Sequence, residues 1–431
     1  MSDGRGPECR MITTGTVIMI NRRVRSRWAG AAIHVVKLDT LEAAYLEAKR
    51  NNGAPGADGE TFERIEARGR AGFLAELSTD LRAGTYRPRP YRRKEIPKDG
   101  GKVRVISIPA IRDRVVQDAL RLILEPIFEA GFSDSSFGAR PGRSAHEAIE
   151  KVRTGLRRRR HRVVDLDLSR YFDSLRHDRM LAKVARRISD GQVLAMVKQF
   201  LKSTGQQGVP QGSPLSPLLA NLALNDLDHA LDRGGGFITY ARYLDDMVVL
   251  APDSEKGKAW ADRALARIRR EAEAVGVSLN TEKTRFVTIT DEHAAFAFLG
   301  FEFRWVPSAK TGRCYPCTTP RPKNVTAVLR KVRDSLRINR HLSVQAAVAQ
   351  VNPILRGWVN YFRVGNSSQA FNKVKYDVER KVRRFAAKQR KRTGFGWKRW
   401  SRDIVYGSWG LFQDYHLAYT SANARAIRPE S

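Results

Sequence analysis

The sequence predicts an α+β fold, with helices and a small antiparallel sheet before about residue 305 and an all-helical region after it. Two observations lead to this expectation. Between residues 163 and 303, short apolar segments are flanked by acidic or turn-forming residues, as in half-buried strands. Beyond residue 320 the apolar residues recur at helical spacing, and one stripe comprises Val374, Val378, Val382 and Phe385.

Local patterns predict the following elements in order. Residues 1–38 are expected to be irregular. Helices are expected over 39–50, 60–83, 111–130, 144–156, 177–202, 218–231 and 255–275. Strands are expected over 163–168, 286–289 and 298–303, with a hairpin around 237–250. The charge run from Arg157 to Arg160 is expected to be solvated.

Residues 86–108 form a basic, strand-like region. Asp99-Gly100-Gly101 predicts a hairpin turn between strands over 94–97 and 103–106. A basic hairpin of this kind suits a triphosphate, although its charges alone fit a solvated face better.

The charge balance indicates a polyanionic partner. The 431 residues include 78 Lys and Arg against 45 Asp and Glu, a net charge of +33. Residues 321–400 alone contain 21 Lys and Arg and 3 Asp and Glu. This density predicts binding to a phosphate backbone, with strong salt dependence.

Cysteine use and hydropathy indicate the compartment. Cys9, Cys314 and Cys317 cannot form a disulfide framework, and the Cys314–Cys317 pair has no two further zinc ligands nearby in the sequence. No apolar run reaches the 18 or so residues of a membrane span. We therefore expect a cytoplasmic protein bound to nucleic acid, with no membrane partner.

Acidic residues in two distant segments indicate phosphoryl chemistry. Asp245 and Asp246 lie between apolar segments at a hairpin tip, and on their own they would fit an ordinary acidic turn. In 163–168 the alternation places Asp165 and Asp167 on one face of a strand. If this strand pairs beside the hairpin, the acids converge as two metals about 4 Å apart would require.

Ordered blocks from about Asn52 to about Tyr415 resemble one family. They are Gly56–Gly59, Tyr86–Pro90, Ile96–Lys98, Ile108–Arg114, Phe137–His146, Asp167–Asp173, Pro210–Asn221, Tyr243–Asp246, Leu279–Thr284, Phe298–Phe301, Asn352–Phe362 and Gly394–Trp400. The chain thereby resembles the bacterial group II intron-encoded reverse transcriptases, or maturases, in a form without the optional nuclease module.

The resemblance implies a right-hand polymerase with an all-helical thumb and maturase region. It implies an N-terminal extension and fingers over 39–160, a palm over 161–305 with parts of 105–130, and a thumb and maturase domain over 306–431. The partners implied are structured RNA, most simply a group II intron, an RNA template with a DNA primer, dNTPs and a DNA target. Whether the protein is a monomer or a homodimer is left open.

The catalytic residues implied by the resemblance are Asp167, Asp245 and Asp246. Asp167 and Asp245 are expected to bridge two Mg²⁺ ions, for which Mn²⁺ could substitute. Leu168 is expected to contribute its carbonyl oxygen, and Asp246 to touch the metals less directly. Asp165 is expected to be structural.

The resemblance also implies binding residues. The residues implied for binding the nucleotide are Lys98, Arg104, Phe172, Gln211, Gly212 and Lys283. Phe172 would act as a steric gate. Lys283 would protonate the leaving pyrophosphate, or it is an ordinary surface lysine. The primer grip would be Phe298, Leu299 and Gly300. Structured RNA would be bound by Arg356, Arg380, Arg384, Lys388 and Lys391. Trp358, Tyr361 and Phe362 fit a hydrophobic core as well as a contact surface.

Departures from the family pattern leave two alternatives. Leu244 stands where alanine is usual, which favours a free-standing relative recruited to DNA repair or defence. Ala139 stands in a block that usually ends Phe-Gly-Phe-Arg, so residue 139 is assigned no role. An RNA-binding splicing factor without polymerase activity is a third hypothesis, against which the intact acids and Gln211 argue.

Overall fold

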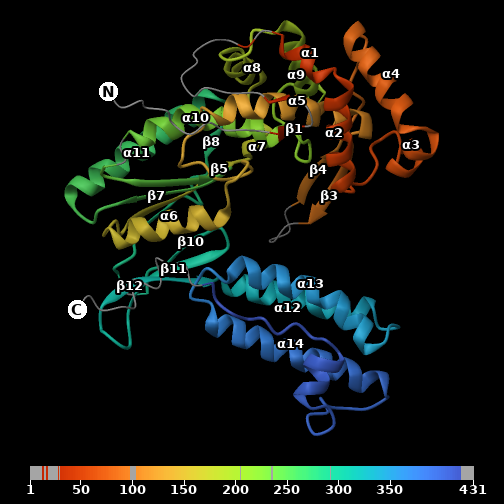
Figure 1. Cartoon of the computed structure of the whole chain (residues 1–431). Coiled ribbons are helices and arrows are strands. Elements are labelled where there is room, and N and C mark those ends of the chain that lie inside the picture. Colours follow the sequence, from red (N-terminus) through yellow and green to blue (C-terminus); the bar gives the residue numbers. More distant parts are fainter. Residues whose placement is uncertain are drawn as a thin grey trace, which may run out of the picture. The chain divides into compact units, whose positions relative to one another are not determined.

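The computed structural model describes residues 12–13, 16–17, 28, 30–97, 103–203, 205–233, 236–291 and 293–418 (Figure 1). These residues form two compact units. The first draws on Met1–Ala148, Leu166–Val249 and Ser254–Arg285, and the second on Ile149–Asp165, Leu250–Asp253 and Phe286–Ser431. Helices and antiparallel strands occur in both units, which confirms the expected α+β class.

The first unit begins with strands β1 (Ile12–Thr13) and β2 (Thr16–Val17) and helices α1 (Ala31–Val35), α2 (Leu38–Arg50), α3 (Phe62–Arg68), α4 (Arg70–Ala83) and α5 (Ile111–Glu129). The strand pair and α1 are regular structure in a segment expected to be irregular. A single helix over 60–83 is wrong. Gly69, at φ 101°, separates α3 from α4, because glycine adopts backbone angles that interrupt a helix.

Strands β3 (Arg92–Pro97) and β4 (Val103–Ile108) form the predicted basic hairpin. They pair antiparallel, with Ile96 opposite Arg104. The predicted turn, Asp99 to Gly101, and the candidate Lys98 lie outside the described residues.

A five-stranded sheet carries the predicted acidic segments. Its order is β6 (Thr239–Tyr243), β7 (Asp246–Ala251), β5 (Arg162–Ser169) and β8 (Ser278–Leu279), with β9 (Arg285–Thr288) also paired to β5. Strand β5 therefore lies next to the β6–β7 hairpin, as expected. Along β5, Leu166 and Leu168 are buried while the two acids are half-buried, which agrees with the alternating pattern.

Helices α7 (Tyr171–Ser174), α8 (His177–Ala185), α9 (Gly191–Lys202), α10 (Ser216–Asp232) and α11 (Glu255–Ala274) complete the first unit (Figure 1). A continuous helix over 177–202 is wrong. Asp190 begins a new helix at this point, because its carboxylate accepts hydrogen bonds from the amides of Gln192 and Val193.

Helix α6 (Ala145–Arg157) leads into the run of arginines. Arg157, Arg158 and Arg159 are solvated or nearly so, as expected, but Arg160 is buried. Burial lowers the pKa of the Arg160 guanidinium, with a smaller effect from Arg158. The prediction of a fully solvated run is therefore wrong at its last residue, which directly precedes the sheet.

The second unit contains a three-stranded antiparallel sheet of β10 (Phe296–Phe298), β11 (Phe301–Pro307) and β12 (Cys314–Pro320). The single strand expected over 298–303 is wrong, because the chain reverses at Leu299-Gly300. Both residues have positive φ, at 47° and 79°, as a tight two-residue hairpin turn requires.

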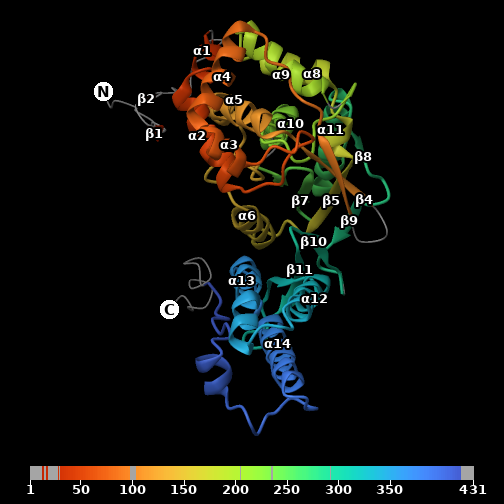
Figure 2. The ribbon, with the colours of Figure 1, turned by 90° about the vertical axis from the view of Figure 1, so that its right-hand side faces the viewer.

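Three long helices follow: α12 (Pro322–Ile338), α13 (Val344–Phe362) and α14 (Ser368–Gln389), which lie side by side in both views (Figures 1 and 2). Val374, Val378 and Val382 of α14 pack in their shared core, which confirms the apolar stripe. A π-helical turn, Asp403–Ser408, follows. Among the described residues, every helix is too short or too polar to span a bilayer.

Candidate active site

The turn between β6 and β7 carries two adjacent carboxylates. Strand β6 ends at Tyr243 and β7 begins at Asp246, so Leu244 and Asp245 form the turn. Leu244 has a φ of 58°, a left-handed conformation that costs a residue with a Cβ about 1–2 kcal/mol. Both carboxylates are exposed, so neither bears the cost of burying a charge.

Asp167 lies on β5, the strand next to β7 in the sheet. Its Oδ2 accepts a hydrogen bond from Asn280 Nδ2 at 3.1 Å and forms an ion pair with Lys283 Nζ at 2.8 Å. The backbone N–H of Asn280 also donates to the Asp167 carbonyl at 2.9 Å. The Asp167 carboxylate is thus held in one orientation at the edge of the β5–β8 pair.

The donor set matches magnesium in kind. Asp167 on β5 and Asp245 in the turn before the neighbouring strand β7 offer carboxylate oxygens, which are the ligands that magnesium prefers. The Lys283 ammonium balances the Asp167 charge in this structure. Within the described ranges, no three carboxylate, imidazole or thiol side chains are gathered as a metal cluster.

A buried arginine supports the turn between β6 and β7. Arg242, the residue before Tyr243, is fully buried and pairs with Asp228 of α10 through two hydrogen bonds of 2.8 and 2.5 Å. Its Nη1 donates to Asn221 Oδ1 at 3.0 Å and to the Leu244 carbonyl at 3.1 Å. The guanidinium therefore links the strained turn directly to α10.

Burial and the contacts with Asp228 shift the pKa values of Arg242 and Tyr240. Burial alone would lower the pKa of Arg242, but the Asp228 carboxylate outweighs burial and raises the pKa overall. Tyr240 donates to Asp228 Oδ1 at 2.9 Å, and burial followed by the Asp228 charge raises the pKa of Tyr240. Arg242 is therefore cationic and Tyr240 is protonated at neutral pH.

The block containing Gly138 packs against the same turn. Phe137 N donates to the Arg242 carbonyl at 2.8 Å, and Asn221 Nδ2 donates to the Gly138 carbonyl at 2.8 Å. A Cβ at Gly138 would lie 2.7 Å from Leu244 N, so only glycine permits this approach. Ala139, in the position that departs from the family pattern, has a φ of 51°.

Predicted nucleotide-binding residues meet between β4 and the loop before α10. Arg104 Nε donates to Gln211 Oε1 at 2.7 Å, and Ser107 N donates to the Gln211 carbonyl at 2.7 Å. Gly212 has a φ of 116°, and a Cβ there would lie 2.7 Å from the Ser107 carbonyl oxygen. The loop and the basic hairpin therefore form one surface.

The two aromatic residues after Asp167 have different environments. Tyr171 is buried and its hydroxyl donates to the Ala220 carbonyl, whereas Phe172 is half-buried with its ring 5.4 Å from that of Tyr171. The Phe172 carbonyl accepts from Val209 N at 2.7 Å, in the same loop that carries Gln211. Tyr171 is thus the core residue of the pair.

Comparisons with known proteins identify the family. A family model described as reverse transcriptase (RNA-dependent DNA polymerase) matches residues 96–303, and one described as the group II intron maturase-specific domain matches residues 325–403. Protein YkfC of Escherichia coli (strain K12) is 33% identical over 331 residues, which cover 65% of this chain and 85% of that protein. The chain belongs to the group II intron reverse transcriptases.

Two further relatives match this reverse transcriptase over shorter lengths. Group II intron-encoded protein LtrA of Lactococcus lactis subsp. cremoris is 32% identical over 212 residues, covering 45% of this chain and 34% of that protein. The putative COX1/OXI3 intron 1 protein of Saccharomyces cerevisiae is 31% identical over 207 residues, covering 45% and 24%. The matches thus span about a third or less of these two relatives.

The predicted primer grip of the reverse transcriptase is a rigid turn in the second unit. The Leu299 carbonyl accepts from the Tyr361 hydroxyl at 2.9 Å, and the Gly300 carbonyl accepts from Asn324 Nδ2 at 2.7 Å. Phe298 is buried. Helices α12 and α13 therefore fix this turn, and Phe362 and half-buried Trp358 belong to the surrounding core.

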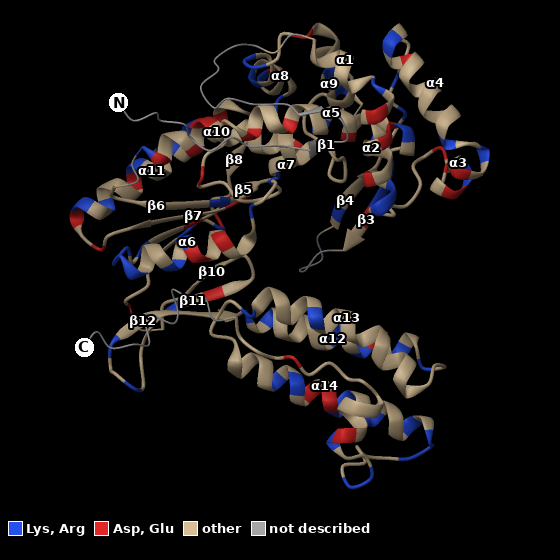
Figure 3. Cartoon of the chain, viewed as in Figure 1, with Lys and Arg blue, Asp and Glu red and all other residues tan. Residues whose placement is uncertain are grey.

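The predicted RNA-binding residues of the maturase domain are mostly solvated. Arg356, Arg384, Lys388 and Lys391 are exposed, and Lys391 lies just beyond the end of α14. Figure 3 shows Lys and Arg concentrated towards this end of α14 and in the segment after it. Arg380 is half-buried and packs over the rings of Tyr376 and Phe395.

Sequence reasoning missed Arg242, Asp228 and Asn221. The signal that could have indicated them is an arginine within an otherwise apolar strand segment, directly before the acidic turn. A charged residue at such a position must be paired, and α10 supplies an acid and an amide on one buried face.

Proposed function

We propose that this reverse transcriptase extends a DNA primer along an RNA template, with Asp167, Asp245 and Asp246 as its catalytic carboxylates. The observation that supports this proposal best is the placement of Asp167 on the strand adjacent to the Asp245 turn. A pair of acids on neighbouring strands is the arrangement that metal-assisted nucleotidyl transfer needs.

Two magnesium ions would be held by the Asp167 and Asp245 carboxylates with the Leu168 carbonyl, and manganese would substitute. When bound, such a pair activates the primer 3′-hydroxyl and stabilises the charge on the departing pyrophosphate. Asp246, at the start of β7, would orient the turn and touch the ions less directly. Lys283 Nζ would hold a proton for the pyrophosphate oxygen.

The incoming dNTP would lie against the surface formed by β4 and the loop at Gln211. Arg104 would bind triphosphate oxygens with its planar guanidinium, together with Lys98. Gly212 would allow the backbone to approach the base pair closely. The half-buried Phe172 ring would exclude a ribose 2′-hydroxyl, so that dNTPs are selected over ribonucleotides.

The maturase domain would bind structured intron RNA. Its exposed cations on and after α14 support contacts to phosphates, and the turn at Leu299-Gly300 would support the primer end. We propose that binding of this kind aids intron folding and splicing, before the polymerase domain copies the intron at a DNA target.

Primer extension on an RNA template with Mg²⁺ tests the polymerase. We expect Asp245→Asn to lower the extension rate by at least about a hundredfold, since even partners outside the metal shell are worth that much. Asp262→Asn is the matched control, because Asp262 is exposed on α11 and distant in sequence from the acidic blocks. Full activity in Asp245→Asn would refute the assignment.

Splicing provides the second test. An unaltered protein that promotes intron splicing but extends no primer would be an RNA-binding splicing factor, and the polymerase proposal would be wrong. If Asp245→Asn retains splicing while losing primer extension, the two activities belong to separate sites, as proposed.

A further inference from the structure

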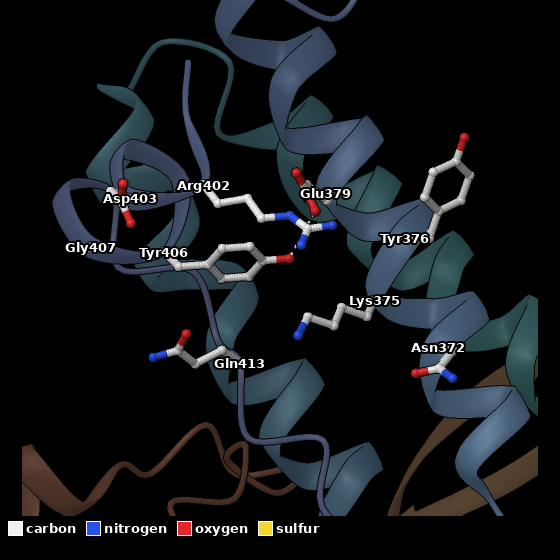
Figure 4. A pocket seen from close by; sticks show the side chains of 9 residues that line it. All are labelled: Asn372, Lys375, Tyr376, Glu379, Arg402, Asp403, Tyr406, Gly407 and Gln413. Atoms are coloured by element: carbon white, nitrogen blue, oxygen red, sulfur yellow. Dashed lines mark hydrogen bonds between the residues drawn. The ribbon is translucent and has the colours of Figure 1, made fainter. Parts of the chain in front are cut away.

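An open cavity lies on the maturase domain between α14 and the π-helical turn with the residues on either side of that turn (Figure 4). Its volume is about 650 Å³, which is within the usual range for small-molecule sites. Asn372, Lys375 and Glu379 line it from α14, and Arg402, Tyr406 and Gln413 from the later segment. None of the predicted RNA-binding residues lines it.

The floor of the cavity is a buried polar network. Glu379 Oε1 accepts from Arg383 Nε and Nη2 at 2.9 and 2.8 Å, and Glu379 Oε2 accepts from the Tyr406 hydroxyl at 3.0 Å. Arg383 also donates to the Trp400 carbonyl at 2.6 Å. Arg383 therefore neutralises the charge of Glu379, and the hydrogen bond to Glu379 holds the Tyr406 ring in position.

Two cationic side chains and two side-chain amides line the cavity. Figure 4 shows Lys375 and Arg402 reaching inward from opposite walls. Lys375 Nζ lies 5.4 Å from the Tyr406 ring centroid, and in the part of the chain described here no carboxylate is within ion-pair distance of Lys375 or Arg402. Asp403 adds one exposed carboxylate at the rim. Asn372 and Gln413 offer both donors and acceptors.

Exposed aromatic rings lie beside the opening. Tyr376, which is 55% exposed, directs its ring outward (Figure 4) and stacks with Trp397, which is 46% exposed, at an interplanar angle of 15°. The two rings together form a small exposed patch, and such patches can mark interaction sites. Flat aromatic faces next to cations are the usual platform for unpaired nucleobases.

We infer that this cavity binds one unpaired nucleotide of RNA, with its phosphate at Lys375 and Arg402 and its base against the aromatic rings. The inference rests on the proposed RNA-binding function of the same domain and assigns a ligand to a specific place in it. Asn372 and Gln413 would contact the edge of the base. Duplex RNA has no free base to insert, so this site would distinguish a loop or bulge from a helix.

Fluorescence anisotropy with two probes tests the inference: a short single-stranded oligoribonucleotide and a blunt RNA duplex with the same number of phosphates. We expect Tyr376→Ala and Lys375→Ala each to weaken single-strand binding about tenfold, and duplex binding by less than about twofold. Lys373→Ala is the matched control. It removes the same charge from a position two residues away on α14, which faces the opposite side of the helix and does not line the cavity.

The outcomes separate the two proposals. Equal losses for both probes in Tyr376→Ala, or equal losses in Lys375→Ala and Lys373→Ala, would overturn the nucleotide site while leaving RNA binding intact. Gln413→Ala changes an exposed position and so guards against misfolding; it should also weaken single-strand binding more than duplex binding. If the unaltered protein binds neither probe, the RNA-binding function itself fails.

Discussion

Arg242 holds the turn between β6 and β7 through a single buried guanidinium group. Leu244 adopts a conformation that a leucine in isolation avoids, and the Arg242 hydrogen bond to its carbonyl helps to keep it there. The same guanidinium is anchored by Asp228 and Asn221. The position of Asp245 therefore depends on a residue that never reaches the substrate.

Arg242→Lys should reduce kcat for primer extension by about ten- to a hundredfold, with KM for dNTP changed less than about twofold. Lysine keeps the charge opposite Asp228 but lacks the planar fork that also reaches Asn221 and Leu244. Steady-state kinetics on an RNA template measure both constants. A change in KM alone would contradict a positioning role.

Arg383→Lys is the control for this substitution. Arg383 is also buried and donates two hydrogen bonds to Glu379 Oε1, but it belongs to the second unit. The Arg383→Lys substitution should lower the free energy of unfolding of the second unit while leaving kcat on a short template unchanged. A similar kcat loss in both variants would indicate a general effect of instability.

At the scale of elements, the segment around Gly138 and the β6–β7 hairpin act as one assembly. The segment forms a short parallel bridge to β6, with Ser136 opposite Arg242. The backbone of Gly138 then touches the backbone of the turn. Such a contact transmits any displacement of the segment directly to Asp245.

Gly138→Ala should lower the primer-extension rate by about a hundredfold, because its Cβ would push the turn away by a fraction of an ångström or more. Gly191→Ala, at the start of α9, introduces the same methyl group into open space and should leave the rate unchanged. Rates and circular dichroism of both variants are the measurements. Equal rates would mean that the turn is free to adjust.

Sequence patterns predicted most elements, and they failed at short interruptions of one to five residues. The apolar periodicity continues past Gly69 and past Asp190. For this reason α3 and α4 were predicted as one helix, and so were α8 and α9. Leu299-Gly300 was hidden within an apolar strand for the same reason, since a leucine with positive φ has no signature in the sequence. Tertiary packing decides these positions.

The site was predicted unevenly. Block motifs located Asp167, Asp245 and Gln211, and strand order places β5 beside the turn. An arginine within an apolar strand indicates that it needs a partner, but the pattern does not say which residues pair with Arg242, because they lie 14 and 21 residues away on another element. An arginine in a strand can support a neighbouring turn in this way only when it is buried, and burial is a property of the folded chain.

For the whole molecule, the net charge of +33 governs binding to nucleic acid. Exposed cations of α14 and the following segment account for much of the excess in residues 321–400. Each phosphate contact releases a counterion, so affinity falls steeply with salt concentration.

Replacing Arg384 and Lys388 by glutamine should reduce the slope of log affinity against log salt by about two for structured RNA. Lys256 and Lys258, exposed on α11, provide the control pair. Titrations over a range of KCl concentrations give the slopes. If the control pair reduces the slope as much as the α14 pair, binding has no preference for the maturase domain.

The backbone of Leu244 has a consequence for laboratory evolution. Glycine or asparagine would occupy its left-handed conformation at lower cost, by about 1 kcal/mol. A selection that rewards only heat tolerance should therefore enrich these residues at position 244, which sequencing of the surviving clones would reveal. Leucine would persist there only under selection for catalysis.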